Sequence, residues 1–440
     1  MLKRISPATP AVRLGDASFP HPFPQTLEYS PAARGTWNIV HTGMLVPEAH
    51  QIYICAAGCL RGVVLTAAEM GERYRERFST LELHEEDLYA TDNETFLIEG
   101  ITEILRRLPK LPPAVLVFTA CVHHFLGCHL AYVYRTLRGR FPSVTFAECV
   151  MDPIRQTKSL TPEERERREI YRLLPTLPPQ EKTCNLLGSN LSLSPTSDIK
   201  AICHTNGWQL RELSEERSFA SFKQEGASTL NLYTNPFSHV AALDIKKRTG
   251  RPFLYLPQVW RAEEIRKART RLAHVLGKED TDAERGEEKS ERALAALRKE
   301  FGSRPLALDF TFTFLPLSLA RLLVTHGFAV REIYADGFSG DDEENFCWLQ
   351  QHAPDILLYP TKHPAMRRKE RTKGDSILAL GQKATYFTGT THFLPDIEGA
   401  GHYGFEAVTW LAHAIHHAAT HAQDARPIIS RKGWGGPSCL

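Results

Sequence analysis

Two cysteines each follow a short apolar run and precede a helical pattern. Cys55 ends the run QIYIC, and Cys121 comes directly after AVLVFTA. At the carboxyl end of a strand in an α/β sheet, side chains face bound ligands, and a helix that begins there favours the thiolate form of cysteine. Thiolates are ligands for iron and zinc. The repeated arrangement therefore predicts a metal or iron–sulfur site at the edge of a sheet.

Further thiols and imidazoles follow both positions. Cys59 and Cys128 lie in the helices expected after the two strands, from which they can reach the same edge. Several histidines lie between residues 121 and 129, which keeps a zinc site open, although the paired Cys-x-x-Cys spacing of structural zinc sites is missing. A buried structural thiol is the ordinary alternative for any single cysteine. The pairing of two strand-end thiols is what favours ligation.

These cysteines need a scaffold of alternating strands and helices. Near-continuous apolar runs alternate with helical patterns from about residue 50, as expected for parallel strands covered on both faces. Two of the helical patterns, HVAALDIKKRTG and LPLSLARLLVTHG, end in the Gly that commonly stops a helix. The pattern predicts an α/β protein with repeated doubly wound parallel-sheet domains. The expected strands are 51–55, 114–119, 144–149, 229–234, 252–257, 306–310, 329–335, 355–360 and 384–387.

Composition changes along the chain predict its segments. The start is proline-rich and is expected to wrap a neighbouring surface, and the turn-rich GSNLSLSPTSD separates two α/β regions. A highly charged stretch at 277–302 is predicted to be a solvated helix or linker. The predicted segments are an extended N-terminal arm (1–35), a cluster-binding α/β domain (36–190), a second Rossmann-like domain with the charged linker (191–300) and a third Rossmann-like domain (301–440).

Size and charge exclude several classes of function. The chain has 440 residues, enough for two or three domains. Its 53 basic and 51 acidic residues give no electrostatic basis for binding nucleic acid or a membrane. No apolar run long enough to span a bilayer and no signal-peptide segment is visible. Nine cysteines without such a signal favour metal or redox chemistry over disulfides, so we expect a cytoplasmic protein.

The residues around the two cysteines resemble those of nitrogenase component 1 and its relatives. His50-Gln-Ile-Tyr-Ile-Cys55 and Cys121-Val-His-His-Phe-Leu-Gly127 are similar to the family's two cluster-ligand segments, and residues 92–100 look like the segment before the second. The resemblance implies three Rossmann-like doubly wound parallel-sheet domains. It also implies an iron–sulfur cluster, either 4Fe–4S or a P-cluster-like 8Fe–7S, that is shared with a homologous sister subunit.

The sequence departs from the family at two ligand positions. The family's earlier cluster cysteine has no counterpart, and Cys59 is the predicted substitute, with an oxygen ligand or another cluster type as alternatives. The family's cofactor-anchoring cysteine follows an Asn-Leu-x-x pattern, whereas here Asn231-Leu-Tyr-Thr is followed by Asn235. Asn235 therefore takes the cofactor-binding position, which argues against dinitrogen as the substrate.

The carboxyl-terminal region resembles the part of the family that binds the active-site cofactor. Thr390-Thr-His392 and Gly401-His-Tyr-Gly-Phe405 carry this likeness. The resemblance implies that His392 is a catalytic, cofactor-binding residue beside a larger iron–sulfur cofactor or the substrate. A structural histidine is the alternative.

Two other patterns lie near the carboxyl end. GAGHYG at 399–404 satisfies the dinucleotide-binding pattern, but no strand runs directly into it, so a dinucleotide site is not expected. His413, His417 and His421 recur at helical spacing. This spacing fits a metal site, but it is more typical of a solvated polar helix face.

The sequence lacks the Gly-x4-Gly-Lys-Ser/Thr P-loop, so ATP hydrolysis is not expected in this chain. The resemblance implies a separate ATP-hydrolysing iron protein as electron donor and a heterodimer or α2β2 heterotetramer with the sister subunit. The expected reaction is reductive cleavage of a small molecule, with a methylthio-alkane as the preferred substrate. The alternatives are a protochlorophyllide-type tetrapyrrole reductase, a cofactor-assembly scaffold, and a zinc-binding α/β protein.

Overall fold

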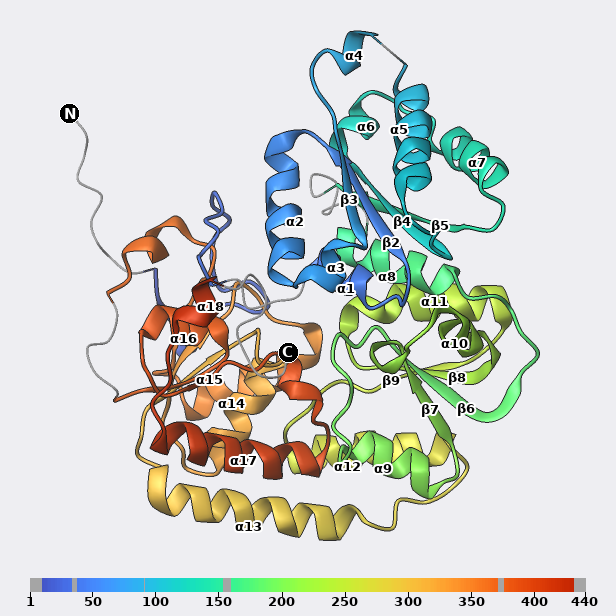
Figure 1. Cartoon of the computed structure of the whole chain (residues 1–440). Helices are drawn as coiled ribbons and strands as arrows, with labels where there is room; N and C mark the ends of the chain where they lie inside the picture. The colour runs from blue at the N-terminus through green and yellow to red at the C-terminus, as the bar shows by residue number, and fades with distance from the viewer. Residues whose placement is uncertain (1–9, 34–37, 91, 153–159, 371–375, 431–440) are drawn as a thin grey trace, which may run out of the picture. The chain divides into compact units, whose positions relative to one another are not determined.

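The computed structural model describes residues 10–33, 38–90, 92–152, 160–370 and 376–430 (Figure 1). The chain divides into two compact units. The cysteine unit comprises residues 37–192 and 208–256, and the carboxyl-terminal unit comprises the remaining residues. No helix within the described ranges is long and apolar enough to cross a membrane.

The cysteine unit contains two four-stranded parallel sheets. In the first, the chain passes from β2 to β3 on one side and then begins β4 on the other side of β2. Ile54 of β2 is level with Thr119 of β4, so the two cysteine-bearing strand ends lie next to each other. In spatial order the strands are β3 (Phe78–Glu82), β2 (His50–Cys55), β4 (Ala114–Ala120) and β5 (Thr145–Met151).

Helices cover both faces of this first sheet, with α5 and α7 on one side and α2 on the other (Figure 1). The strands β2 and β4 are wholly buried, as their continuous apolar runs require. Asp92 caps α5 by accepting a hydrogen bond from the Thr95 N–H at 2.7 Å. The helices of this part are α1 (Ile39–Met44), α2 (Ala57–Glu69), α3 (Glu72–Arg75), α4 (Asp87–Ala90), α5 (Asn93–Arg107), α6 (Cys121–Phe125), α7 (Leu130–Arg140) and α8 (Pro162–Arg172).

The second sheet of the cysteine unit repeats the same winding. The chain passes from β6 to β7 on one side and places β8 on the other side of β6. Its strands are β7 (Gln209–Glu212), β6 (Gln180–Leu187), β8 (Ser228–Tyr233) and β9 (Phe253–Tyr255), and its helices are α10 (Phe219–Lys223) and α11 (His239–Thr249).

The carboxyl-terminal unit is built on a six-stranded sheet that is parallel except for β1. The strand order is β1 (Val12–Arg13), β12 (Leu357–Tyr359), β11 (Val330–Tyr334), β10 (Leu306–Asp309), β13 (Leu378–Leu380) and β14 (Phe393–Leu394). Its helices are α9 (Asp198–Thr205), α12 (Ala262–Val275), α13 (Ala283–Phe301), α14 (Pro316–Thr325), α15 (Glu343–His352), α16 (Gln382–Thr388), α17 (Phe405–Thr420) and α18 (Arg426–Ser430).

The predicted α/β class with parallel sheets is confirmed, and eight of the nine expected strands are present. The prediction for 384–387 is wrong, because this apolar run lies in the buried helix α16. Gly381 and Gly389 flank that helix with positive φ angles of 104° and 71°. A short apolar run does not distinguish a buried strand from a buried helix.

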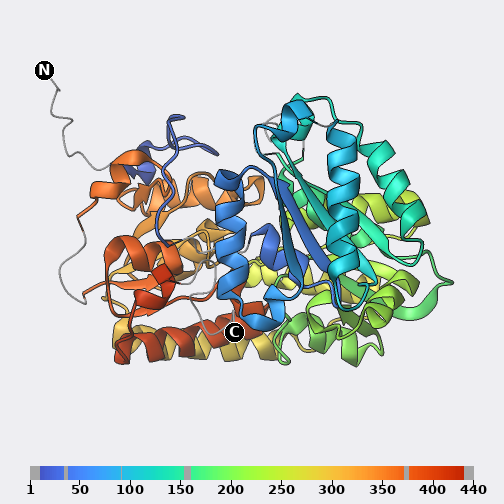
Figure 2. The same cartoon turned by 45° about the horizontal axis from the view of Figure 1, so that its top comes forward.

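Two segments with unusual composition pack against their own unit. The charged stretch contains α13, which was expected, and this helix lies alongside α17 in both views (Figure 1 and Figure 2). The described part of the N-terminal arm does not stand free. Val12 pairs with Leu358 of β12, and Leu14 is fully buried in the core.

Candidate functional site

The two strand-end cysteines lie at one edge of the first sheet. Cys55 is the last residue of β2 and is buried, and Cys121 follows β4 as the first residue of α6. Since β3 and β4 flank β2 on opposite sides, the sheet changes winding direction between β2 and β4. Ligands of α/β sheets bind at the carboxyl ends of the strands at this point.

A third thiol joins them. Cys59 lies in the first turn of α2 and shares a side-chain hydrogen bond with Cys55. Burial, then Cys59, then Cys121 raise the pKa of Cys55 to about 12. Cys59 and Cys121 therefore lie close enough to Cys55 to disfavour the ionisation of its thiol.

The thiol group consists of the kind of ligand that iron–sulfur clusters take. Among the described residues, no group of three or more His, Cys, Asp or Glu side chains is arranged around one metal position. A multi-iron cluster takes thiolates from separate elements, here β2, α2 and α6. Thiols must lose their protons to bind a metal centre. A cationic centre would also offset the repulsion between the neighbouring thiolates that result.

Cys128 is not part of this thiol group. Burial and the nearby Glu94 raise its pKa to about 12, and the Glu94 carboxylate shares a hydrogen bond with the thiol. His123 has a structural role, because its Nδ1 accepts a hydrogen bond from the Ala120 N–H at 3.1 Å. The zinc alternative around residues 121–129 therefore has no assembled ligand set among the described residues.

The segments that carry Cys59 and Cys121 also carry exposed apolar side chains. Cys59 itself is exposed. On α2, Val64 and Leu65 are 40% and 41% exposed. At the end of α6, Phe125 is 68% exposed, and the C-cap residue Leu126 is 42% exposed. These exposed apolar side chains lie in the same chain segments as Cys59 and Cys121.

His50, which begins the family-like segment, is buried in β2. Its Nε2 lies 2.8 Å from the Ser79 hydroxyl. Burial and the positive charge of Arg77 lower the pKa of His50 to about 4, so the ring is neutral at physiological pH. The contact with Ser79 on β3 holds His50 at the amino end of the strand whose carboxyl end carries Cys55.

Asn235 lies at the equivalent point of the second sheet, just beyond the end of β8. Its side-chain oxygen accepts a hydrogen bond from the Phe237 N–H at 3.0 Å. Its side-chain nitrogen is buried and has no partner among the described residues. Ser238 nearby has a buried hydroxyl that is also unpartnered there. Asn235 can offer a hydrogen bond to a ligand, but it cannot replace a thiolate.

His392 directly precedes β14 in the carboxyl-terminal unit. Its Nδ1 lies 2.7 Å from the carbonyl oxygen of Ala418, so Nδ1 carries the proton and the lone pair is on Nε2. This is the tautomer that a metal-ligating histidine needs. However, His392 lies at the amino end of its strand, whereas parallel sheets present ligands at the carboxyl ends.

A different histidine, His402, lies in the segment that follows the carboxyl end of β14. Its Nδ1 lies 2.8 Å and 2.9 Å from the two carboxylate oxygens of Glu406, and its ring stacks on Trp410 at 4.3 Å between centroids. The preceding residues 398–401 all have positive φ angles, including Glu398 at 48° and Ala400 at 52°. Such strain collects at functional sites. The sequence feature that could have identified His402 is the spacing of four residues between it and Glu406, directly after a Gly-rich turn.

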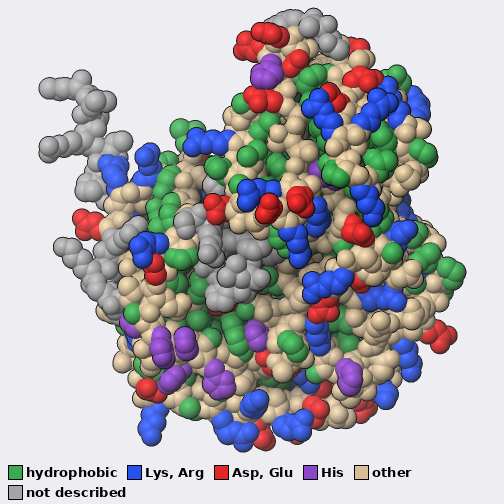
Figure 3. All heavy atoms as spheres, in the orientation of Figure 1, with side chains coloured by type: hydrophobic (Ala, Val, Ile, Leu, Met, Phe, Trp, Pro, Cys, Tyr) green, Lys and Arg blue, Asp and Glu red, His purple; other side chains and the backbone are tan. Residues whose placement is uncertain are grey.

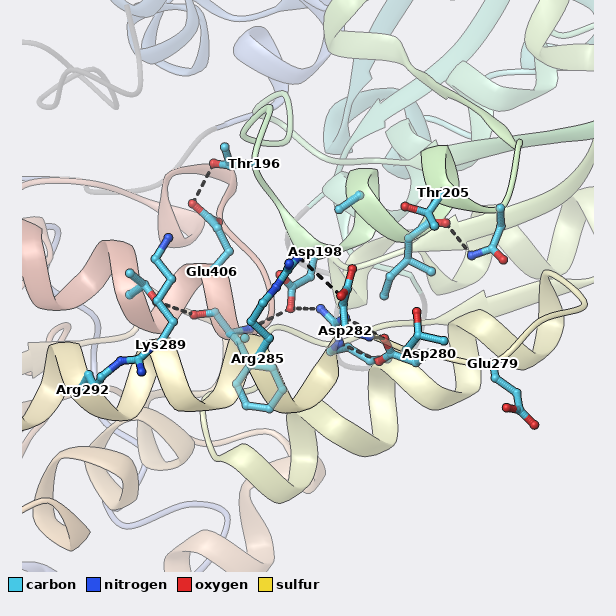
Figure 4. A pocket seen from close by; sticks show the side chains of 18 residues that line it. Thr196, Asp198, Thr205, Glu279, Asp280, Asp282, Arg285, Lys289, Arg292 and Glu406 are labelled. Atoms are coloured by element: carbon cyan, nitrogen blue, oxygen red, sulfur yellow. Dashed lines mark hydrogen bonds and ion pairs between the residues drawn. The ribbon is translucent and has the colours of Figure 1, made fainter.

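A polar pocket of about 550 Å³ lies in the carboxyl-terminal unit between α9, α13 and the start of α17 (Figure 4). Four basic and five acidic side chains line it. Arg269 donates to Asp280 at 2.7 Å and pairs with Asp198, and Glu406 accepts a hydrogen bond from Thr196 at 2.9 Å. These charges nearly balance, so the lining does not specify the charge of a ligand.

Comparisons with known proteins give one family. The family model described as nitrogenase component 1 type oxidoreductase matches residues 40–392. The structure is similar to "Nitrogenase Cp1 at pH 6.5", with 12% identity and a TM-score of 0.66 over 90% of this chain and 94% of that one. It is also similar to "Nitrogenase Cp1 at pH 5", with 14% identity and a TM-score of 0.59 over 93% and 94% of the two chains. None of the curated proteins matches the chain in sequence.

Proposed function

Because the chain belongs to the family of nitrogenase component 1 type oxidoreductases, we propose that it is a subunit of the substrate-reducing component of a nitrogenase-like reductase. The observation that carries the proposal is the convergence of Cys55, Cys59 and Cys121 at the point where the first sheet changes winding direction. These three residues are the proposed ligands of a 4Fe–4S or 8Fe–7S cluster.

Each ligand has its own task. Cys55 is fixed by a buried strand, Cys121 is held directly after β4 as the first residue of α6, and Cys59 stands in for the family's missing cysteine. When bound there, an iron–sulfur cluster supplies one-electron transfer. This chain would hold the thiolates and would shield the buried Cys55 at the end of β2 from water.

A sister subunit completes the proposed site. Clusters of this kind are normally held by about four thiolates or more, and this chain brings three together. The exposed Phe125, Leu126, Val64 and Leu65 offer that subunit an apolar surface beside the thiols. An ATP-hydrolysing iron protein as electron donor, a heterodimer or α2β2 assembly, and a cytoplasmic location belong to the same proposal.

The proposed reaction is the reductive cleavage of a methylthio-alkane. In the carboxyl-terminal unit, His392, whose Nδ1 faces the Ala418 carbonyl oxygen, is the proposed catalytic and cofactor-binding residue. In the cysteine unit, Asn235, with its unpartnered side-chain N–H, is separately proposed as a cofactor-binding residue. His402, with Glu406 behind it, is a second histidine to test, since it follows the ligand-facing end of β14. A protochlorophyllide-type reductase and a cofactor-assembly scaffold remain the alternative functions.

The test is anaerobic co-expression of this chain with its sister subunit. We expect a brown complex that contains iron, shows an electron paramagnetic resonance signal when reduced, and turns over substrate with its iron protein and ATP. An iron-loaded complex without turnover would favour the assembly scaffold. A colourless complex with zinc in place of iron would contradict the proposal.

A further inference from the structure

The acidic side chains of the polar pocket in the carboxyl-terminal unit are mostly paired with one another's neighbours. The total charge of the lining is nearly balanced, but its charged groups differ in what they contact. Asp198 and Asp280 both pair with Arg269, whose side chain is 8% exposed. Glu406 is engaged by the imidazole of His402. These contacts use up most of the negative charge in the pocket.

Three basic side chains on α13 form another wall of the pocket. Arg285, Lys289 and Arg292 are four and three residues apart, so they lie on one face of the helix. Figure 4 shows them following one another along α13, while Glu279 lies at the other end of the view and points away from them. Figure 3 shows Lys and Arg side chains along the lower edge of the view, over the same helix. The other side of α13 packs into the core.

These basic groups are weakly engaged. Lys289 forms no hydrogen bond or ion pair with any residue in the described ranges. The Arg292 guanidinium lies 4.0 Å from the Glu288 carboxylate, and the two side chains are 73% and 71% exposed. Arg285 and Asp282 are 3.4 Å apart and similarly exposed. Since exposed ion pairs of this kind are weak, an anionic ligand can replace them readily.

Two contacts fix the wall and the loop before it. At Gly286, α13 approaches α17 so closely that a Cβ would lie 3.2 Å from the Phe405 side chain. Arg269 holds the preceding loop through two hydrogen bonds of 2.7 Å to the Asp280 carboxylate. A site that is held in place before binding loses less conformational freedom when its ligand arrives.

We propose that this pocket binds a small phosphorylated molecule, with Lys289 and Arg292 contacting its phosphate groups. The cavity of about 550 Å³ has the size of a small-molecule site. A phosphate has three acceptor oxygens, so it can bind an ammonium group and a guanidinium fork together. Every lining residue belongs to the carboxyl-terminal unit, so the site is separate from the cysteines and does not depend on the proposed function.

The test is calorimetric titration of the purified complex with sodium pyrophosphate, at constant ionic strength and without magnesium. We expect the wild type to bind one equivalent per chain at this site. Lys289→Gln and Arg292→Gln should each weaken that binding by roughly 10–100-fold, the usual effect of losing a hydrogen bond to a charged group. Lys289→Arg keeps the positive charge and should retain most of the affinity. Added salt should weaken the wild-type binding.

The matched control is Lys299→Gln, which removes the same charge from an exposed position on α13 outside the pocket lining. This variant should bind pyrophosphate as the wild type does, and circular dichroism should show that all the variants are folded. Wild-type affinity in both Lys289→Gln and Arg292→Gln would overturn the proposal. An equal loss in Lys299→Gln would also overturn it, because the effect would then be one of general charge. Malonate bound as tightly as pyrophosphate would contradict the assignment to phosphate.

Discussion

The thiol of Cys55 should be unusually unreactive when no cluster is bound. Its pKa is raised from 9.0 to about 12, first by burial and then by Cys59 and Cys121. Raising the pKa by this amount lowers the thiolate fraction at pH 8 by roughly 1000-fold, and the thiolate is the form that alkylating reagents attack. We therefore expect Cys55 to be alkylated roughly 1000-fold more slowly than an ordinary accessible cysteine.

The assay is iodoacetamide labelling of the metal-free complex, followed by peptide mass spectrometry at successive times. The exposed Cys59 and Cys347 should be labelled first and serve as internal references. The pH dependence separates the electrostatic cause from simple steric protection. If the pKa is raised, the labelling rate of Cys55 keeps increasing above pH 9; if the thiol is only shielded, the rate levels off there.

A second variant tests the cause directly. Cys59→Ser removes one of the groups that raise the pKa of Cys55, so labelling of Cys55 at pH 8 should become faster. The raised pKa also makes the free energy of unfolding depend on pH. The Cys55 thiol has the higher pKa in the folded metal-free protein, so its stabilising contribution is present below pH 9 and is lost as the pH rises toward 12. Labelling of Cys55 as fast as that of Cys347 would refute this account of the thiol group.

Three further outcomes are expected. Gly381→Ala should lower the free energy of unfolding by about 1–3 kcal/mol, because Gly381 has a φ of 104° and a Cβ there would collide with the Asp309 carboxylate. Gly139→Ala, at a position in α7 with open space around it, should raise the free energy of unfolding by about 0.5–1 kcal/mol. Urea unfolding measures both changes. His392→Ala and His402→Ala should each abolish substrate reduction while the complex keeps its iron; unchanged turnover in one of them would make that histidine structural. Expressed without its sister subunit, the chain should be insoluble or poor in iron, and an iron-loaded monomer would contradict the shared site.

The sequence predicted that Cys55 and Cys121 lie at the ends of buried strands, because the signals for this placement are local in the sequence. Each thiol ends a continuous apolar run, and such runs mark buried parallel strands. What the sequence alone did not contain was the strand order. Only the placement of β3 and β4 on opposite sides of β2 makes the two strand ends adjacent at a winding change.

Other features escaped because tertiary contacts decide them. The strands β3 and β6 carry polar residues along an exposed part, so neither shows a continuous apolar run. The run at 384–387 became a helix because glycines with positive φ angles start and stop it. The sequence did not predict the site at His402, because this residue lies in a Gly-rich turn and its pairing with Glu406 depends on where α17 begins.

The most direct measurement of the central claim compares two cysteines in the same segment. Cys121→Ala and Cys128→Ala would each be purified anaerobically with the sister subunit, and iron content and the electron paramagnetic resonance spectrum would be recorded. The account predicts that Cys121→Ala loses iron and the cluster signal, while Cys128→Ala, whose thiol faces Glu94, keeps both. Full iron and an unchanged spectrum in Cys121→Ala would contradict the assignment of the cluster to this edge of the sheet.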